Sequence, residues 1–233
     1  MSCRFATTLY MKSINPDELK ELANQVTWDN GEAGYALPQG SLALLMLCVR
    51  KFECRRVFEF GSGASTRVFL EAGCEVTSLE NDQHWLGHTL KQVPETMRAR
   101  HHAELRPLER TWCGGFPCFG WNLSETMRAQ LGSADLVLVD SPAYPPFREA
   151  ALMQALLESK ARLVVLDDVR IPTLRRFCDR IAMQSHGINV TYIERDHTLA
   201  IFTRSGSSVL SNRPGFVEQI KGWRRYLMGR SAK

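Results

Sequence analysis

The chain has 233 residues, of which 44% are hydrophobic and 23% are charged, and its formal net charge is +4. This length and composition are typical of one globular domain and exclude an intrinsically disordered, collagen-like or coiled-coil chain. The longest clean apolar run, residues 42–49, is far shorter than the roughly 20 residues of a membrane span, so we expect no contact with a membrane.

The cysteines and the basic residues bear on location and partners. The seven cysteines show no C-x-x-C spacing, and the N-terminus lacks the apolar stretch of a secretion signal. We therefore expect reduced thiols in a cytoplasmic protein. Residues 204–233 carry a net charge of +6, which leaves the rest of the chain at −2. The body of the protein is thus not a basic surface for nucleic acid.

The predicted elements follow an alternating order after a helical start. Residues 1–51 hold two expected helices, 15–26 and 40–51. Strands and helices then alternate, as strand 56–60, helix 64–72, strand 75–80, helix 84–93, strand 103–108, helix 124–131, strand 134–140, helix 147–160, strand 161–167 and helix 173–185. An aromatic, glycine-rich loop is expected at 111–121. Strands 188–194 and 198–203 follow, and a last helix covers 217–227.

This order predicts the fold class. Strands separated by helices pair in parallel, whereas the short link between the last two strands allows only an antiparallel hairpin. The chain is therefore predicted to be α/β and doubly wound, with a seven-stranded mixed sheet that ends in a hairpin.

The ends of the first two strands suggest a ligand. In open α/β sheets, ligands bind outside the carboxyl ends of the strands. The first strand ends in Glu59 and Phe60, and the turn after it contains Gly61 and Gly63, which allow the backbone to approach a ligand closely. Glu80 ends the second strand, where its carboxylate can accept hydrogen bonds from both ribose hydroxyls. These features indicate a ligand that contains a nucleoside.

The kind of nucleoside follows from what the turn lacks. The dinucleotide fingerprint G-x-G-x-x-G has a third glycine where this chain has Thr66. No G-x-x-x-x-G-K-[ST] motif occurs, which excludes the phosphate loop of nucleoside triphosphatases. An adenosyl sulfonium fits this turn better than a pyrophosphate does.

Four segments together resemble a known superfamily. The segments E-F-G-S-G-A-S-T, S-L-E-N-D, L-V-L-V-D-S-P and L-V-V-L-D-D are similar to those of class I S-adenosylmethionine-dependent methyltransferases, over about residues 40–204. The resemblance implies a Rossmann-like methyltransferase fold in a single domain. Its parts would be a helical N-terminal cap (1–51), a cofactor-binding core (52–204) and a basic C-terminal helix (205–233).

The resemblance also implies roles for individual residues. The glycine turn would hold the methionine part of S-adenosylmethionine, Glu80 the ribose, and Asn81 would lie near the adenine. Asp140 would face the amino group of the cofactor or the acceptor. The cofactor-binding residues that it implies are Glu59, Phe60, Gly61, Ser62, Gly63, Ser65, Thr66, Glu80, Asn81 and Asp140.

Three acids at neighbouring strand ends are candidates for the chemistry. Asp140, Asp167 and Asp168 resemble the magnesium-binding acids of catechol-type O-methyltransferases, and oxygen ligands of this kind suit Mg²⁺. The alternative is a metal-free site in which Asp140 or Asp168 is the catalytic general base. A third interpretation is that Asp167 and Asp168 only cap the following turn.

The acceptor and the rival functions stay open at this point. The V-D-S-P strand end is similar to that of methyltransferase-like proteins that act on sugars, which favours a small or sugar-like acceptor for O-methylation over nucleic acid. The aromatic residues that could line an acceptor pocket are Trp28, Tyr35, Trp112, Trp121 and Tyr144. An NAD(P)-dependent oxidoreductase and a non-catalytic binding protein on the same scaffold are the alternatives. The sequence leaves open whether the protein forms a homodimer.

Overall fold

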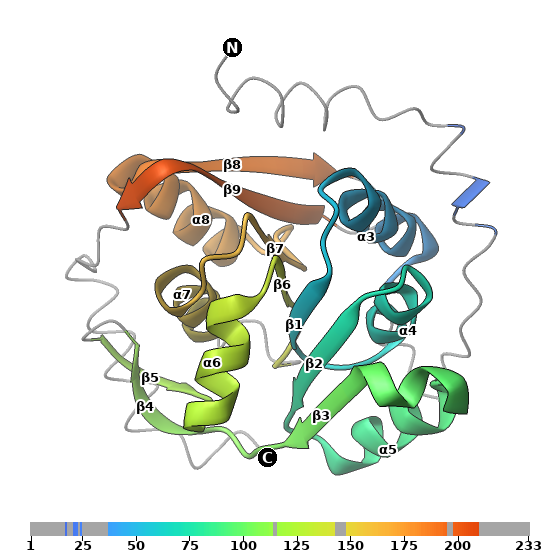
Figure 1. The fold of residues 1–233 in the computed structure, drawn as a ribbon. Coiled ribbons are helices and arrows are strands. Elements are labelled where there is room, and N and C mark those ends of the chain that lie inside the picture. Colours follow the sequence, from blue (N-terminus) through green and yellow to red (C-terminus); the bar gives the residue numbers. More distant parts are fainter. Residues whose placement is uncertain are drawn as a thin grey trace.

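A seven-stranded sheet forms the centre of the computed structural model (Figure 1). The structure describes residues 17, 21, 22, 24, 37–113, 116–142, 148–194 and 198–209. In their order across the sheet, the strands are β3 (His101–Leu105), β2 (Glu75–Glu80), β1 (Arg56–Phe60), β6 (Leu136–Val139), β7 (Leu163–Leu166), β9 (Thr198–Val209) and β8 (His186–Glu194). The first five are parallel, and β9 pairs antiparallel with both β7 and β8.

Helices cover both faces of this sheet, as Figure 1 shows. The first face carries α3 (Gln39–Lys51), α4 (Ala64–Glu71) and α5 (Gln83–Gln92). The second face carries α6 (Glu125–Ser133), α7 (Arg148–Glu158) and α8 (Pro172–Gln184). The 3₁₀-helix η1 (Glu95–Arg100) leads into β3, and a separate hairpin is formed by β4 (Glu109–Cys113) and β5 (Phe116–Gly120).

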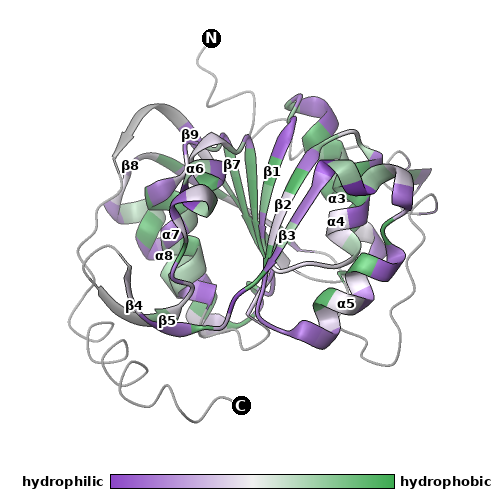
Figure 2. Ribbon diagram, turned by 60° about the horizontal axis from the view of Figure 1, so that its bottom comes forward, coloured by the Kyte–Doolittle hydropathy of each residue, from purple (hydrophilic) through white to green (hydrophobic). Residues whose placement is uncertain are grey.

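Alternation along the strands produces two apolar cores. In β1, Val57 packs with α3 and α4, whereas Phe58 and Phe60 pack against the helices of the second face. All three side chains are almost fully buried. Burial of each such side chain contributes about 1.5–3 kcal/mol, so the strand is held from both sides. Figure 2 shows the central strand β7 hydrophobic, and the edge strand β3 largely hydrophilic.

The predicted fold class is confirmed, with three differences in detail. The third strand lies at 101–105 rather than 103–108, because its edge position demands few apolar residues. The expected loop at 111–121 contains most of the hairpin β4–β5, whose two strands pair with each other and with no other described strand. The last strand extends to Val209, past the expected core boundary at residue 204.

Both ends of the chain lie mainly outside the described residues. The expected helix 217–227 falls entirely outside them. Within the expected helix 15–26, the four described residues, Asp17, Glu21, Leu22 and Asn24, are helical. No helix in the described part of the chain has the length and apolar character needed to cross a membrane.

Candidate functional site

The turn after β1 is tied to both neighbouring strands. Gly61 donates its backbone N–H to the carbonyl of Leu79 in β2, at 2.8 Å. The carbonyl of Phe60 accepts hydrogen bonds from the backbone N–H groups of Asp140 (3.0 Å) and Ser141 (2.8 Å), just after β6. Gly61 has φ +115°, and a Cβ there would lie 2.9 Å from the Cβ of Ser141. Only glycine fits both the conformation and the space.

Glu59 lies beneath this turn, with 1% of its surface exposed. Its carboxylate accepts hydrogen bonds from the hydroxyls of Ser65 (2.6 Å), Thr66 (2.7 Å) and Ser78 (2.9 Å). Burial raises the pKa of Glu59 to about 7, although the three hydroxyls act in the opposite direction. Glu59 therefore connects β1, the start of α4 and β2 through its side chain.

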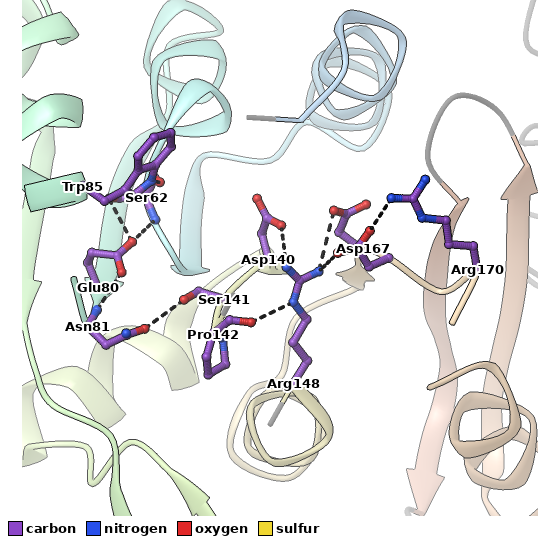
Figure 3. Close-up of polar contacts among 11 residues, drawn as sticks. Ser62, Glu80, Asn81, Trp85, Asp140, Ser141, Pro142, Arg148, Asp167 and Arg170 are labelled. Atoms are coloured by element: carbon purple, nitrogen blue, oxygen red, sulfur yellow. Dashed lines mark hydrogen bonds and ion pairs between the residues drawn. The ribbon is translucent and has the colours of Figure 1, made fainter. Parts of the chain in front are cut away.

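Glu80 closes the turn from the end of β2. Its carboxylate accepts hydrogen bonds from the backbone N–H groups of Ser62 (3.1 Å), Asn81 (2.7 Å) and Asp82 (3.0 Å). A fourth, longer contact of 3.3 Å comes from the Ser62 hydroxyl. Burial raises the pKa of Glu80, and these donors lower it. The carboxylate is thus oriented by backbone donors and stands next to the glycine turn (Figure 3).

Two further residues complete this half of the site. The Ser141 hydroxyl donates a hydrogen bond to the Asn81 side chain at 3.1 Å, which joins the ends of β2 and β6. Trp85, in the first turn of α5, donates its indole N–H to the Ser62 carbonyl. The Trp85 ring would lie 3.5 Å from a Cβ placed on Gly63. The sequence analysis did not single out Trp85, although its position three residues after the helix cap Asp82 puts it at the mouth of the turn.

The three predicted acids come together at the ends of β6 and β7, around an arginine (Figure 3). The side chains of Asp140, Asp167 and Asp168 are 27%, 3% and 17% exposed. Arg148, in α7, lies between them with 5% of its surface exposed. Its guanidinium nitrogens are 3.4 Å from Asp140, 3.7 Å from Asp167 and 3.1 Å from Asp168.

Arg148 also fixes the backbone after Asp140. Its Nε–H donates a hydrogen bond to the Pro142 carbonyl at 3.0 Å. Arg148 was not predicted as a site residue, yet the sequence contains a signal for it. Arg148 shares helical spacing with Ala151, Leu152 and Ala155, which are all buried, so it had to lie on the inner face of its helix.

The acids differ in their electrostatic settings. Withdrawal of the Asp140 carboxyl from water raises its pKa well above the usual value, the Asp167 carboxylate raises it further, and Arg148 lowers it. Asp168 adopts a left-handed backbone conformation with φ +62°, which aspartate tolerates better than most residues. Asp168 also lies 3.7 Å from the exposed guanidinium of Arg170.

Comparison with known proteins establishes the fold. No protein-family model and no curated protein matches the chain. The O-methyltransferase TomG from Streptomyces achromogenes, solved in complex with SAM, is similar over 86% of this chain and 96% of that chain, at 18% identity and a TM-score of 0.58. The SAH-bound methyltransferase PaMTH1 from Podospora anserina is similar over 87% and 95%, at 16% identity and a TM-score of 0.55.

A third solved structure agrees. The O-methyltransferase from Bacillus cereus in complex with SAH is similar over 85% of this chain and 97% of that chain, at 16% identity and a TM-score of 0.54. The chain has the fold of the class I S-adenosylmethionine-dependent methyltransferases. In this methyltransferase fold, the glycine turn, Glu80 and the three acids all lie at the carboxyl ends of the parallel strands.

The acids do not form the metal site that the sequence left open. A divalent cation such as Mg²⁺ lies 2.0–2.1 Å from its oxygen ligands, so three oxygens bound to one ion lie within about 4 Å of each other. Here a guanidinium lies among the three carboxylates instead. Among the described residues, no group of three His, Cys, Asp or Glu side chains could hold a metal ion. The residues present therefore do not fit Mg²⁺.

The aromatic candidates separate into different environments. Trp121 is fully buried, packs at a tilt against Phe60 with the ring centroids 5.4 Å apart, and donates its indole N–H to the Arg106 carbonyl, so it belongs to the core rather than to an acceptor pocket. Trp112, in β4, is 54% exposed. Trp28, Tyr35 and Tyr144 lie outside the described residues.

Proposed function

We propose that the protein is an S-adenosylmethionine-dependent methyltransferase that methylates a hydroxyl oxygen of a small or sugar-like molecule. The observation that carries the proposal is the buried Glu80 carboxylate held against the glycine turn, in a sheet whose strand β9 runs antiparallel between β7 and β8. The three solved methyltransferases with this fold support the cofactor, because their structures contain SAM or SAH.

The residues at the ends of β1 and β2 fit an adenosyl cofactor. Glu80 would accept hydrogen bonds from the ribose hydroxyls, and the longest of its contacts, to the Ser62 hydroxyl at 3.3 Å, is the one that a ribose hydroxyl would replace. Asn81 would lie beside the adenine, and the turn from Gly61 to Gly63 would hold the methionine part. When bound, the cofactor supplies a methyl group already activated on a sulfonium.

The acceptor would approach from the side of Asp140. The Asp140 side chain is 27% exposed, and its raised pKa makes the carboxylate a stronger base once ionised. Asp140 would take the proton of the acceptor hydroxyl as the acceptor oxygen receives the methyl group. The cofactor would supply that methyl group and would keep the electron pair of the carbon–sulfur bond on sulfur. Asp168 would orient the acceptor through a hydrogen bond.

Sheet topology and Thr66 disfavour the oxidoreductase alternative. The dinucleotide-binding sheet has six parallel strands in the order 3-2-1-4-5-6 and no antiparallel strand within it. Here β9 interrupts that order. The Thr66 hydroxyl donates a hydrogen bond to Glu59 and accepts one from the Gly63 N–H at 3.0 Å, so Thr66 stabilises the turn. A dinucleotide site has its third glycine at this position.

Calorimetric titration with S-adenosylhomocysteine tests this proposal. We expect binding by the wild type and about a hundredfold weaker binding by Glu80→Ala, because hydrogen bonds to a charged group contribute about 1.5–3 kcal/mol each. Glu75→Ala, at the exposed opposite end of the same strand, is the matched control and should bind normally. In a parallel assay with methyl-labelled cofactor and a panel of hydroxylated small molecules, Asp140→Asn should bind the cofactor but lose transfer.

Two results would contradict the proposal. The first is binding of NADH in preference to the adenosyl compounds, which would favour the oxidoreductase. The second is wild-type affinity in Glu80→Ala, which would remove Glu80 from the cofactor site.

A further inference from the structure

Arg148 occupies the centre of the acid cluster, where its charge has a specific consequence. Its guanidinium is buried and carries a positive charge. It lies within 3.1–3.7 Å of one oxygen from each of Asp140, Asp167 and Asp168. The cluster therefore contains its own fixed cation.

The position of Arg148 is set by three separate elements. The side chain extends from α7, its Nε–H donates to the Pro142 carbonyl after β6, and its terminal nitrogens face the two acids after β7. Figure 3 shows the guanidinium between Asp140 and Asp167, with Asp140 on one side and the end of β7 on the other. Among the described residues, no three His, Cys, Asp or Glu side chains are placed to hold a metal ion, and the guanidinium stands among the three carboxylates instead.

We infer that Arg148 takes the place of a divalent cation in this site. Arg148 neutralises the repulsion among the three carboxylates and holds Asp140 and Asp168 in place through its ion pairs with them. The site is thereby made independent of metal. Arg148 is a positioning residue, because its own surface is 95% buried and it acts through the two acids. The role of Arg148 in positioning Asp140 and Asp168 for methyl transfer rests on the proposed function. Its replacement of a divalent cation does not.

Removal of the guanidinium should create a metal site. In Arg148→Met the three carboxylates lose the guanidinium that lies among them, and we expect them to bind Mn²⁺ at least about tenfold more tightly than the wild type does, since a buried unit charge at this distance changes affinity by more than 1.4 kcal/mol. Binding is measured from the electron paramagnetic resonance signal of free Mn²⁺. Arg148→Lys keeps the positive charge and should not gain the site. Arg148→Met with Asp167→Asn should lose it again.

A second test needs no Arg148 variant and therefore applies even if Arg148→Met does not fold. Wild-type protein should leave the free Mn²⁺ signal unchanged. Binding by the wild type that Asp168→Asn abolishes would overturn the inference, as would a folded Arg148→Met variant that gains no Mn²⁺ affinity. None of these measurements uses methyl transfer, so failure of the proposed function leaves them intact.

Activity separates positioning from general stability. In the labelled-methyl assay, Arg148→Met should lower kcat, Arg148→Lys should recover part of it, and the affinity of both for S-adenosylhomocysteine should stay at the wild-type value. Equal losses of kcat and cofactor affinity in the two variants would contradict a positioning role.

Discussion

Glu59 shows how a single buried acid can shape both the site and the stability of the protein. It occupies a position in β1 that faces the apolar core of α3 and α4, where Val57 lies two residues earlier. Three hydroxyls satisfy its oxygens, but they do not replace the water that the carboxylate loses. The folded protein therefore favours the protonated acid, and the pKa rises to about 7.

This gives a pH dependence of stability with a definite sign. Between pH 4.5, the ordinary pKa of the side chain, and about 7, the folded state keeps a proton that the unfolded state has lost. The free energy of unfolding should therefore fall as pH rises through this window, by about 3 kcal/mol from this group alone. In Glu59→Gln the position cannot ionise, so the decline should be smaller by that amount.

Urea unfolding at pH 5, 6, 7 and 8 measures this difference. The wild type and Glu59→Gln share every other titrating group, so subtracting their unfolding free energies isolates Glu59. Glu75→Gln, at the exposed start of β2, is the control and should follow the wild type. A constant difference between wild type and Glu59→Gln at all four pH values would contradict the raised pKa.

The residues of the site were predictable to different degrees. The acids Asp140, Asp167 and Asp168 follow from the rule that parallel strand ends meet at one edge of the sheet. Arg148 lies eight positions after Asp140 in a helix, and an arginine at a helix start is commonly solvated. Its contact with the acids depends on how α7 packs on the sheet, which the strand-end rule does not describe.

At the scale of elements, the sequence predicted the regular alternation of strands and helices but not the hairpin β4–β5, which lies outside that alternation. The alternation of apolar strands and helices determined β1 and β2 to the residue, and β6 and β7 to within two residues at each end. The hairpin β4–β5 has no such pattern, and it contains Pro117, which argues against a strand in most sheets. This hairpin lies outside the main sheet and can accept the proline because, among the described strands, β5 pairs with β4 alone.

Three glycines in different elements should respond to alanine in three different ways. Gly61→Ala combines positive φ with a Cβ that would lie 2.9 Å from the Ser141 Cβ, so we expect a loss of about 3 kcal/mol. Gly73, after α4, has φ +90° but open space around it, so Gly73→Ala should lose only about 1 kcal/mol. Gly87 lies inside α5 with nothing nearby, so Gly87→Ala should gain about 0.5–1 kcal/mol.

Urea unfolding of the three variants at one pH provides the ranking. The difference between Gly61→Ala and Gly73→Ala isolates the close approach of the turn to the end of β6. Equal losses at the two positions would mean that the turn moves freely away from Ser141 and is not fixed by it.

At the scale of the whole molecule, the two cores share the strands between them. Successive residues of β6 alternate between the two, since Leu136 and Leu138 belong to the core of the first face and Val137 and Val139 to that of the second. Neither face can lose its helices without exposing one side of the same strands. This arrangement favours cooperative unfolding of the described core as one unit.

Buried thiols on both faces can report on this cooperativity. Cys48 in α3 and Cys74 before β2 lie on the first face, and Cys178 in α8 lies on the second; all three are at most 1% exposed. Burial raises the pKa of Cys48 to about 12 and of Cys74 to about 11, and it raises that of Cys178 further. Because the thiolate is the reactive form, these residues should react with iodoacetamide only when the protein unfolds.

Cofactor binding should then slow all three thiols equally. A ligand at 100 times its dissociation constant stabilises the folded state by about 2.7 kcal/mol, which reduces the unfolded population and the labelling rate about a hundredfold. Mass spectrometry of labelled peptides, with and without S-adenosylhomocysteine, gives the rate at each cysteine, and Glu80→Ala should slow only about twofold at this concentration. Slowing confined to Cys48 and Cys74 would mean that the helices of the second face open independently of the cofactor site, and would contradict a single cooperative unit.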